Sequence, residues 1–343
     1  MLEECTHSWL LTLVVHMVTM FMNFSRETEV RKIGVIGLGP IGGILAACLS
    51  SSRLPVIGVD VWDEHRKKIK ERGITITGSA SVQSRLQKVL PRVLDLKGEE
   101  PLDYIFITVK TPHLKHIIDD LLAVPGDFHV IAFQNGIDNE EFLAQHFLRE
   151  RVMRGAINYA GNIDKPGRIR MTFFHKPNYL GCLCSDKVCK HARELALLMS
   201  KSGLDTEPTA QIKNFTWKKT ILNAGLSGLC GLLGITMAEA MSNKETSHLV
   251  ELILKEAIEV AKKAGFDYGE SFIDYCIDYL SKAGNHKTSM HIDLEHGQPT
   301  EIDFINGKIV WYGRELNVPV PINSTLTALI KAKESKMMSL KII

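Results

Sequence analysis

The sequence feature that constrains the fold most is a glycine-rich turn between an apolar strand and an apolar helix. Residues 33–36 form a short apolar run typical of a buried parallel strand, and the spacing Gly37-x-Gly39-x-x-Gly42 follows at once. An apolar helix is expected directly afterwards, at 44–49. A dinucleotide fingerprint requires this strand–turn–helix context. In preference to a purely structural turn, we predict a cofactor-binding turn formed by Gly37, Leu38, Gly39, Pro40, Ile41 and Gly42.

Each glycine of this turn has a separate physical task. Gly37 permits the tight turn, Gly39 lets the backbone approach a pyrophosphate, and Gly42 allows the helix to pack closely on the strand. The start of the helix then offers free N–H groups and the positive end of its dipole to the phosphates.

Composition sets the limits for the rest of the chain. Its 343 residues leave room for two domains, and 45% apolar and 23% charged residues are ordinary for a globular protein. The net charge of +2, with no basic cluster interleaved with aromatic residues, argues against a nucleic-acid partner. The seven cysteines do not suggest a disulfide framework; they favour a reducing compartment, so we expect a cytoplasmic protein.

No metal site is expected. Cys182, Cys184 and Cys189 lack a second pair at the spacing of zinc ligands. Three histidines recur every five residues between 286 and 296, a period that does not keep them on one helix face. We interpret both groups as structural or surface residues.

Residues 1–30 are predicted to be an apolar leader. The run 9–22 is strongly apolar, but it is shorter than the roughly 20 residues that a membrane span needs. Glu3 and Glu4 stand where a secretory signal would have basic residues, and no small-x-small cleavage site follows. We interpret the leader as dispensable or mis-assigned, and a peripheral membrane anchor is the alternative.

A second buried strand is expected at 56–60, and it ends in a carboxylate. Asp60 lies 23 residues after Gly37, where a dinucleotide-binding fold places the group that reads the adenosine ribose. A carboxylate there accepts hydrogen bonds from the ribose hydroxyls and repels a 2′-phosphate, so Asp60 favours NADH. Three basic residues follow at 66–68 and would suit NADPH, although a solvated helix face explains them more simply.

Two further buried strands deliver polar residues to the same edge of the sheet. The strand at 103–109 is followed by Lys110, and the strand at 129–133 is followed by Gln134 and Asn135. Ligands of open α/β sheets bind outside the carboxyl ends of the strands, where the glycine turn also lies. Asn135 precedes Gly136, a pair that also suits a simple tight turn, so the pattern alone leaves both interpretations open.

The remaining periodicities define two domains. Residues 151–183 show a period near two, which predicts antiparallel strands that extend the sheet, before a helix at 187–202 and a short strand at 204–206. Helices are then expected at 211–241, 246–264, 269–283, 299–316 and 322–335. The predicted fold class is α/β: a Rossmann-type dinucleotide-binding domain at 31–207, followed by an all-α domain at 208–343. The cleft between the domains is the expected substrate site.

The start of the helical domain contains a candidate proton donor. Lys219 and Asn223 are four residues apart and so share one helix face. A lysine facing the cleft can polarise a keto oxygen and then protonate it. From this segment alone, a solvated lysine near a helix start is the simpler interpretation.

The C-terminal part of the chain resembles a known family. The stretch 288–307 resembles the signature segment of the ketopantoate reductases (2-dehydropantoate 2-reductases), and 313–323 is close to that family's run before its final helix. The resemblance covers about 32–335, and it includes the glycine turn, Lys110, Asn135-Gly136 and Lys219-x-x-x-Asn223.

The resemblance implies two catalytic residues. The family's general acid, a lysine that protonates the ketone oxygen while hydride arrives at C2, falls on Lys219. The glutamate that orients this lysine and engages the substrate hydroxyl falls on Glu301. An ammonium–carboxylate pair in a partly closed cleft would set the orientation and protonation of the lysine. Without the resemblance, Glu301 is explained by the dipole of a following helix.

The resemblance also implies residues that bind substrate and cofactor. The family's substrate-holding serine falls on Ser289 and its first helical-domain asparagine on Asn223. Lys110 and Asn135 match residues near the nicotinamide, its ribose and the substrate. Without the resemblance, Ser289 reads as a helix N-cap.

The chain departs from the family pattern at two places. Ser227, also predicted to bind substrate, occupies the position of a second asparagine, and Gly228 replaces the usual proline. The shorter side chain has less reach, so a different or smaller 2-oxo acid becomes an alternative substrate. Asp60 is the second departure, because many members that prefer NADPH have a basic residue near the end of this strand.

Three functions are consistent with these residues. The first is a ketopantoate reductase that makes (R)-pantoate for pantothenate and coenzyme A synthesis with NADH or NADPH. The second is a reductase of another branched 2-oxo acid. The third is a non-catalytic NAD(H)-binding regulatory protein, against which the presence of both Lys219 and Glu301 argues. The expected partner is a small-molecule 2-oxo acid. A homodimer is an alternative to a monomer, because the apolar faces at 246–283 suit a dimer interface or a core equally.

Overall fold

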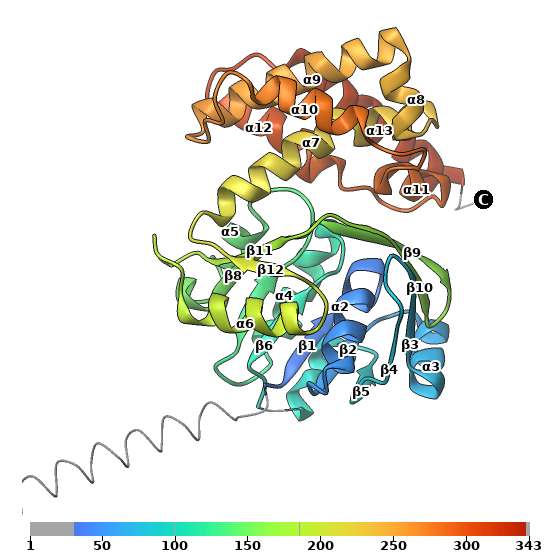
Figure 1. Cartoon of the computed structure of the whole chain (residues 1–343), viewed down its shortest axis with the longest axis vertical. Coiled ribbons are helices and arrows are strands. Elements are labelled where there is room, and N and C mark those ends of the chain that lie inside the picture. Colours follow the sequence, from blue (N-terminus) through green and yellow to red (C-terminus); the bar gives the residue numbers. More distant parts are fainter. Residues whose placement is uncertain (1–30, 100, 185, 341–343) are drawn as a thin grey trace, which may run out of the picture.

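The computed structural model describes residues 31–99, 101–184 and 186–340, so the leader expected at 1–30 lies outside the described residues. The described chain forms two parts along the long axis of the molecule, one of sheets and helices and one of helices alone (Figure 1). The predicted α/β fold class is confirmed: a domain with a largely parallel sheet comes first and an all-α domain second.

The main sheet brings the ends of its parallel strands to one edge. Its strand order is β12-β11-β8-β7-β6-β1-β2-β5. Strand β1 is parallel to β2 and β6, and β6 is parallel to β7, so the carboxyl ends of these four strands lie together. The strands are β1 Ile33–Ile36, β2 Val56–Val59, β5 Lys88–Leu90, β6 Tyr104–Ile107, β7 His129–Ala132, β8 Val152–Ala156, β11 Asn178–Cys182 and β12 Thr206–Pro208.

Both faces of the main sheet are covered at its centre, which explains why strands β1, β2 and β6 are apolar and fully buried. Ile33 and Val35 of β1 belong to the core on the side of α2 and α6, whereas Ile36 belongs to the core on the side of α4. The helices of this domain are α2 Pro40–Ser51, α3 Asp63–Arg72, α4 Leu114–Leu122, α5 Asn139–Leu143 and α6 Lys190–Lys201.

The prediction that the strands after residue 151 all extend the main sheet as antiparallel strands is wrong. Strand β8 is parallel to β7, and only β11 pairs with β8 in the antiparallel sense. Strands β9 (Tyr159–Lys165) and β10 (Arg168–Phe174) instead form a second sheet with β3 (Ile74–Gly78) and β4 (Val82–Ser84).

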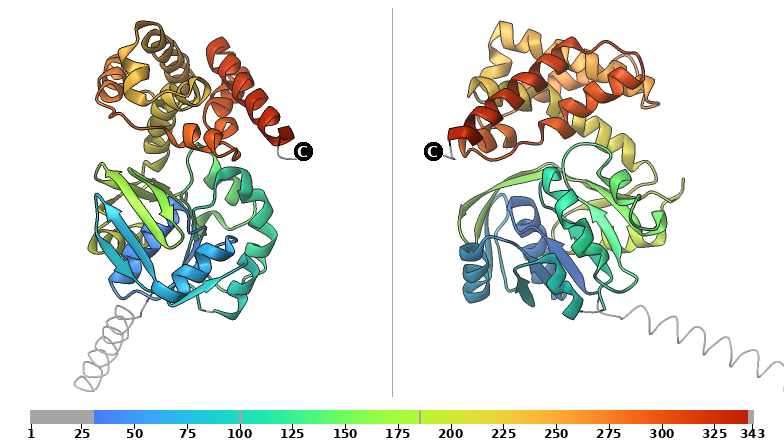
Figure 2. Two further views of the ribbon diagram at one scale, coloured as in Figure 1. Left: turned by 90° about the vertical axis from the view of Figure 1, so that its right-hand side faces the viewer. Right: turned by 180° about the vertical axis from the view of Figure 1, so that it is seen from behind.

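The physical reason is a one-sided apolar pattern. In β10, Ile169 and Met171 are buried, whereas Arg168 and Arg170 are exposed. Such strands suit a sheet with one solvent-exposed face, unlike the fully buried central strands β1, β2 and β6 of the main sheet. The buried face lies against α2, so α2 is held between the two sheets (Figure 2, left).

The helical domain is built around α7 (Ile212–Leu233), which packs on α9, α11 and α13. The lower end of α7 in Figure 1 also contacts β8 and β11, so this helix joins the two domains. No helix in the described ranges is both long and apolar enough to cross a membrane. The other helices are α8 Met237–Ser242, α9 Lys244–Lys263, α10 Phe272–Ser281, α11 Ser289–Glu295, α12 Asn306–Glu315 and α13 Pro321–Leu340.

Several predicted helix boundaries need correction. The single helix expected at 211–241 ends before Gly234, whose φ of 70° is left-handed, and Thr236 then caps α8 with Glu239. The helix expected at 299–316 begins only at 306, after a short 3₁₀ turn, η4 (Ile302–Phe304). The N-cap interpretation of Ser289 implies a helix start near this residue, but no range is predicted for α11, because its seven residues are too few to show a helical period.

The interpretation of the cysteines also needs correction. Cys182 and Cys189 form a disulfide across the connection between β11 and α6, with their Cα atoms 6.4 Å apart. The pairing depends on the fold, which returns the chain from the strand to the helix start, and the seven-residue separation alone does not indicate it. The free cysteines of the described ranges are Cys48, Cys184, Cys230 and Cys276.

Candidate active site

The glycine turn lies at the carboxyl edge of the main sheet. Gly37 has a φ of 93°, and a Cβ on Gly42 would lie 1.9 Å from the Gly37 carbonyl oxygen. A Cβ on Gly39 would meet nothing within 4 Å, so the space above this residue is open. Pro40 is the first residue of α2, which leaves the N–H groups of Ile41 and Gly42 in its first turn. The turn therefore leaves room for a pyrophosphate beside a helix N-terminus.

Asp60 at the end of β2 holds this turn in place. One carboxylate oxygen accepts the Leu38 N–H at 2.7 Å, and the other accepts the Trp62 N–H at 2.8 Å. Each oxygen keeps a further lone pair. The nearby Arg66 donates to the backbone carbonyl of Asp60 and pairs with Asp63 at 2.7 Å. The basic residues at 66–68 are therefore partly engaged on the surface of α3.

The polar residues predicted at the ends of β6 and β7 meet Glu301 from the helical domain. One oxygen of Glu301 accepts the N–H and the hydroxyl of Thr111, both at 3.2 Å. The other oxygen accepts the amide of Asn135 at 3.0 Å. Glu301 is only 9% exposed, so these hydrogen bonds form a buried connection between the domains. Gly136, with a φ of 84°, permits the approach, because a Cβ there would lie 2.4 Å from the Phe304 carbonyl oxygen.

Lys110 forms a second connection between the domains. Its ammonium pairs with Asp293 of α11 at 2.6 Å and donates to the Pro299 carbonyl at 3.4 Å. Burial raises the pKa of Asp293, and the charge of Lys110 opposes this effect. Lys110 and Glu301 thus lie at the same junction, although they come from different domains.

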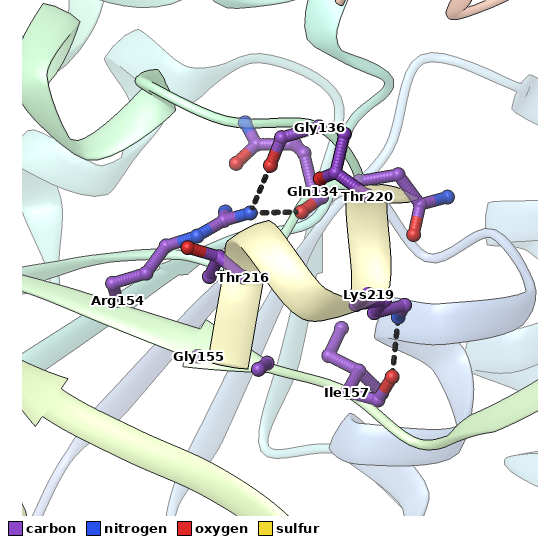
Figure 3. Close-up of a pocket in the computed structure, with 10 residues that line it drawn as sticks. Gln134, Gly136, Arg154, Gly155, Ile157, Thr216, Lys219 and Thr220 are labelled. Carbon is purple, nitrogen blue, oxygen red and sulfur yellow. Dashed lines mark hydrogen bonds between the residues drawn. The ribbon is translucent and has the colours of Figure 1, made fainter. Parts of the chain in front are cut away.

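Lys219 faces the sheet domain from α7. Its ammonium donates to the Ile157 carbonyl (Figure 3). Burial lowers the pKa of Lys219 to about 8; the positive charge of Arg154 adds to this shift, and the carboxylate of Glu301 opposes it. Among the described residues, no ion pair within 4.0 Å joins Lys219 to Glu301. In place of the expected direct pairing, Lys219 bonds to the Ile157 carbonyl, and Glu301 accepts hydrogen bonds from Thr111 and Asn135 of the sheet domain.

The predicted substrate residues lie on α7 and at the start of α11. Asn223 is one turn after Lys219 and partly exposed, and Ser227, one turn further, is 7% exposed. Ser289 is the exposed first residue of α11. The N-cap interpretation of Ser289 is wrong, because Thr288 caps the helix and also donates to the Ser227 carbonyl at 3.4 Å.

Three residues of the site had no predicted role. Thr111 follows Lys110 directly, and its position after a buried strand was the available signal. Asp293 lies inside the family-like segment, but nothing in one sequence pairs it with Lys110. Arg154 lies in the middle of β8, all of whose residues are buried, and an arginine is unexpected there. The described residues contain no cluster of three or more His, Cys, Asp or Glu side chains suited to a metal ion.

The arrangement suits proton transfer coupled to hydride transfer. A half-buried lysine, a buried carboxylate and several amide donors lie at the edge of the sheet where the glycine turn is open. Such a site can give a proton to an oxygen while a bound nicotinamide gives hydride to the adjacent carbon. The fold and the site together define the class of the dinucleotide-dependent oxidoreductases.

Comparison with family models gives the particular family. Residues 33–184 match the model described as ketopantoate reductase PanE/ApbA, and residues 211–334 match the model of the C-terminal domain of the same family. The chain belongs to the ketopantoate reductase family, and it is an oxidoreductase acting on a CH–OH group.

Individual relatives agree with this assignment. A 2-dehydropantoate 2-reductase of Streptococcus pyogenes serotype M3 (strain ATCC BAA-595 / MGAS315) is 26% identical over 304 residues, which cover 88% of this chain and 97% of that protein. The ternary structure of D-mandelate dehydrogenase with NADH and anilino(oxo)acetate has a TM-score of 0.81 at 27% identity, covering 89% of this chain and 99% of that one. The 2-dehydropantoate 2-reductase of Methylococcus capsulatus has a TM-score of 0.79 at 26% identity, covering 89% and 97%.

Proposed function

We propose that the chain reduces 2-dehydropantoate to (R)-pantoate with a nicotinamide dinucleotide, in the pathway to pantothenate and coenzyme A. The observation that supports this most is the half-buried Lys219, which lines a small cavity together with Asn135, the residue bonded to Glu301 across the domain junction. A relative from Streptococcus pyogenes is named for this reaction.

Each side chain has a defined task in this proposal. Lys219 gives the proton on Nζ to the keto oxygen, and its enclosure favours release of that proton near neutral pH. Glu301 and Asn135 hold each other across the domain junction and so orient the substrate hydroxyl and the nicotinamide side of the site. Asn223 and Ser289 are polar donors for the substrate carboxylate.

The cofactor is proposed to bind along Gly37–Gly42, with Lys110 and Asn135 near the nicotinamide ribose. The open space at Gly39 fits a pyrophosphate, and a bound dinucleotide supplies the hydride. We favour NADH over NADPH because Asp60 ends β2 with a carboxylate. Arg66 supports this preference, because its pairing with Asp63 leaves it less able to neutralise a 2′-phosphate.

A second substrate is favoured by one specific feature. Ser227 is shorter than the asparagine expected in the family, and Gly228 after it packs against Leu326 of α13, where a Cβ would lie 2.9 Å from the leucine side chain. This part of α7 therefore differs in shape as well as in polarity. D-mandelate dehydrogenase has a similar fold, so a 2-oxo acid with a bulky side chain is the alternative substrate.

The test follows NADH and NADPH oxidation at 340 nm with 2-dehydropantoate, pyruvate, 2-oxoisovalerate and phenylglyoxylate offered in turn. We expect the highest kcat/KM for 2-dehydropantoate and a preference for NADH. A higher kcat/KM for one of the other acids would contradict the proposed substrate and point to Ser227. A preference for NADPH would contradict the role given to Asp60.

We also propose that the domains divide between residues 207 and 208, that the chain forms a homodimer and that it is cytoplasmic. Strand β12 ends at Pro208 and α7 begins at Ile212, so the connection between the sheet and the helical domain lies at 209–211, directly after the proposed division. Leu249, Tyr275 and Tyr279 are at least 38% exposed on α9 and α10, which supports a dimer through these helices. Light scattering after size-exclusion chromatography should give twice the chain mass, and a monomer mass would reject the dimer.

A further inference from the structure

A buried arginine lies behind the turn that presents Asn135. Arg154 on β8 is 2% exposed, and its Nη2 donates to the carbonyl oxygens of Gln134 and Gly136, both at 2.7 Å (Figure 3). These carbonyls flank Asn135, whose amide reaches Glu301. One nitrogen of the guanidinium therefore holds both sides of the residue that joins the two domains.

The guanidinium is not fully satisfied by the protein. Glu140 of α5, 1% exposed, is its counter-charge, with Oε2 3.4 Å from Nε. Nε and Nη1 of Arg154, this Oε2, and both amide atoms of Gln134 have no hydrogen-bond partner among the described residues. Buried polar atoms of this kind require partners, and ordered water commonly supplies them.

A small cavity joins this cluster to the proposed proton donor. Its lining comes from the Gln134–Gly136 turn, from β8 and from one face of α7, and it has room for about one water molecule. Figure 3 shows these residues together. Arg154 and Lys219 both line the cavity, and both therefore act on the same enclosed space.

We infer that Arg154 is a positioning residue for the reaction proposed above: its Nη2 holds the carbonyl groups on both sides of Asn135, and its charge acts on Lys219 across the small cavity that both side chains line. The expected effect of Arg154 on kcat rests on the proposed function, whereas its effect on the ionisation of Lys219 does not.

The charges around Lys219 come from several elements. Arg154 of β8 lowers the pKa of Lys219 and Glu301 raises it, while burial has the largest effect. Glu140 lies behind Arg154, and burial raises the pKa of its carboxyl. Lys218 points elsewhere, with its ammonium 4.0 Å from the ring centre of Tyr275. Loss of the Arg154 charge should therefore make Lys219 hold its proton to higher pH.

The first experiment measures the ionisation of Lys219 without using substrate. The intact protein is labelled with trace acetic anhydride over a pH series, and the peptide containing Lys219 is quantified by mass spectrometry, with fragment ions separating Lys218. In Arg154→Met/Glu140→Gln, which removes both buried charges, we expect the labelling midpoint to rise by about one pH unit. In Arg154→Lys, which keeps the charge, the midpoint should stay. An unchanged midpoint in the double variant overturns the charge effect.

The second experiment tests the hold on the turn. The ammonium of a lysine lies one bond closer to the backbone than Nη2 does and falls short of the two carbonyl oxygens, so Arg154→Lys should lower kcat about tenfold. The KM for NADH should rise less than kcat falls, because Asn135 is also proposed to lie near the nicotinamide ribose. Arg170→Met is the matched control, because Arg170 is exposed on the second sheet. An unchanged kcat in Arg154→Lys overturns the positioning role, and this variant decides the matter even if the double variant does not fold.

The two experiments separate this inference from the proposed function. If the protein reduces none of the 2-oxo acids tested, the proposed function fails, but the labelling midpoint still reports on Arg154 and Lys219. If it reduces 2-dehydropantoate and neither variant differs from the control, the inference fails alone.

Discussion

The two halves of the candidate site are built in different ways. The cofactor half is one short turn, Gly37–Gly42, in which backbone geometry and the absence of side chains matter most. The catalytic half consists of side chains from distant segments, since 166 residues of sequence separate Asn135 from Glu301. Changes in the first half should therefore act on cofactor affinity through sterics, and changes in the second half should act on turnover through charge.

The largest expected effect is at Lys219 and would sharpen this contrast. Lys219→Met should lower kcat by on the order of 10² or more, because it removes the proposed general acid, while NADH affinity is unchanged. Lys218→Met is the matched control, since this neighbour lies against Tyr275. Steady-state kinetics and NADH fluorescence titration measure the two quantities. An unchanged kcat in the Lys219 variant would reject the general-acid role.

The pH dependence of kcat/KM should arise from the catalytic half alone, through the ionisation of Lys219. Reduction needs protonated Lys219, whose pKa is lowered to about 8, so kcat/KM for the keto acid should be flat below pH 8 and fall about tenfold per unit above it. Oxidation of the hydroxy acid needs the neutral lysine, so its rate should rise through the same range. Profiles in both directions check this, and parallel profiles would contradict it.

Two alanine substitutions should separate the tasks of the glycines. A Cβ on Gly39 enters open space, so Gly39→Ala should keep the stability of the protein but raise the KM for NADH about tenfold by displacing the pyrophosphate. A Cβ on Gly42 would lie 2.2 Å from the Thr108 hydroxyl oxygen, so Gly42→Ala should lower the free energy of unfolding by about 1–3 kcal/mol. Denaturant unfolding and cofactor titration measure both. Equal stability loss in the two variants would contradict the contrast.

The smallest expected effect is at Asp60, a charged side chain that bonds to the glycine turn of the cofactor half. Asp60→Asn keeps one acceptor for the Leu38 or Trp62 N–H but removes the negative charge. The ratio of kcat/KM with NADH to that with NADPH should fall about threefold to tenfold, with little change in kcat. A ratio that does not change would limit Asp60 to holding the turn.

The same difference explains what the sequence could predict. The fingerprint turn needs only local spacing, and the succession of buried strands and helices gives the fold class. The second sheet was misplaced because the period-two pattern of β10 identifies a strand but not its partner. The disulfide and the Lys110–Asp293 pair were missed for a similar reason, because each depends on where the fold brings distant residues.

Lys219 and Glu301 show most clearly that a sequence can identify site residues without identifying their hydrogen-bond partners. Both positions follow from the family-like segments, but the expected direct pairing is not present: Lys219 bonds to the Ile157 carbonyl, and Glu301 bonds to Thr111 and Asn135. One sequence cannot show which of several possible donors is bonded to a carboxylate in the folded protein. Arg154 gave no signal at all, since a buried arginine in an apolar strand has meaning only once its carbonyl and carboxylate partners are placed.

The position of α2 between two sheets has a consequence for the ionic strength at which the protein can work. Every residue of α2 from Gly42 to Leu49 is buried, so neither water nor salt ions reach the flanks of the helix. The field at its N-terminus is then weakened by mobile ions only at the mouth of the glycine turn, not along the helix. The second sheet thus keeps water and ions away from the helix dipole that attracts the phosphates. Cofactor affinity should therefore decrease only slightly as the salt concentration rises.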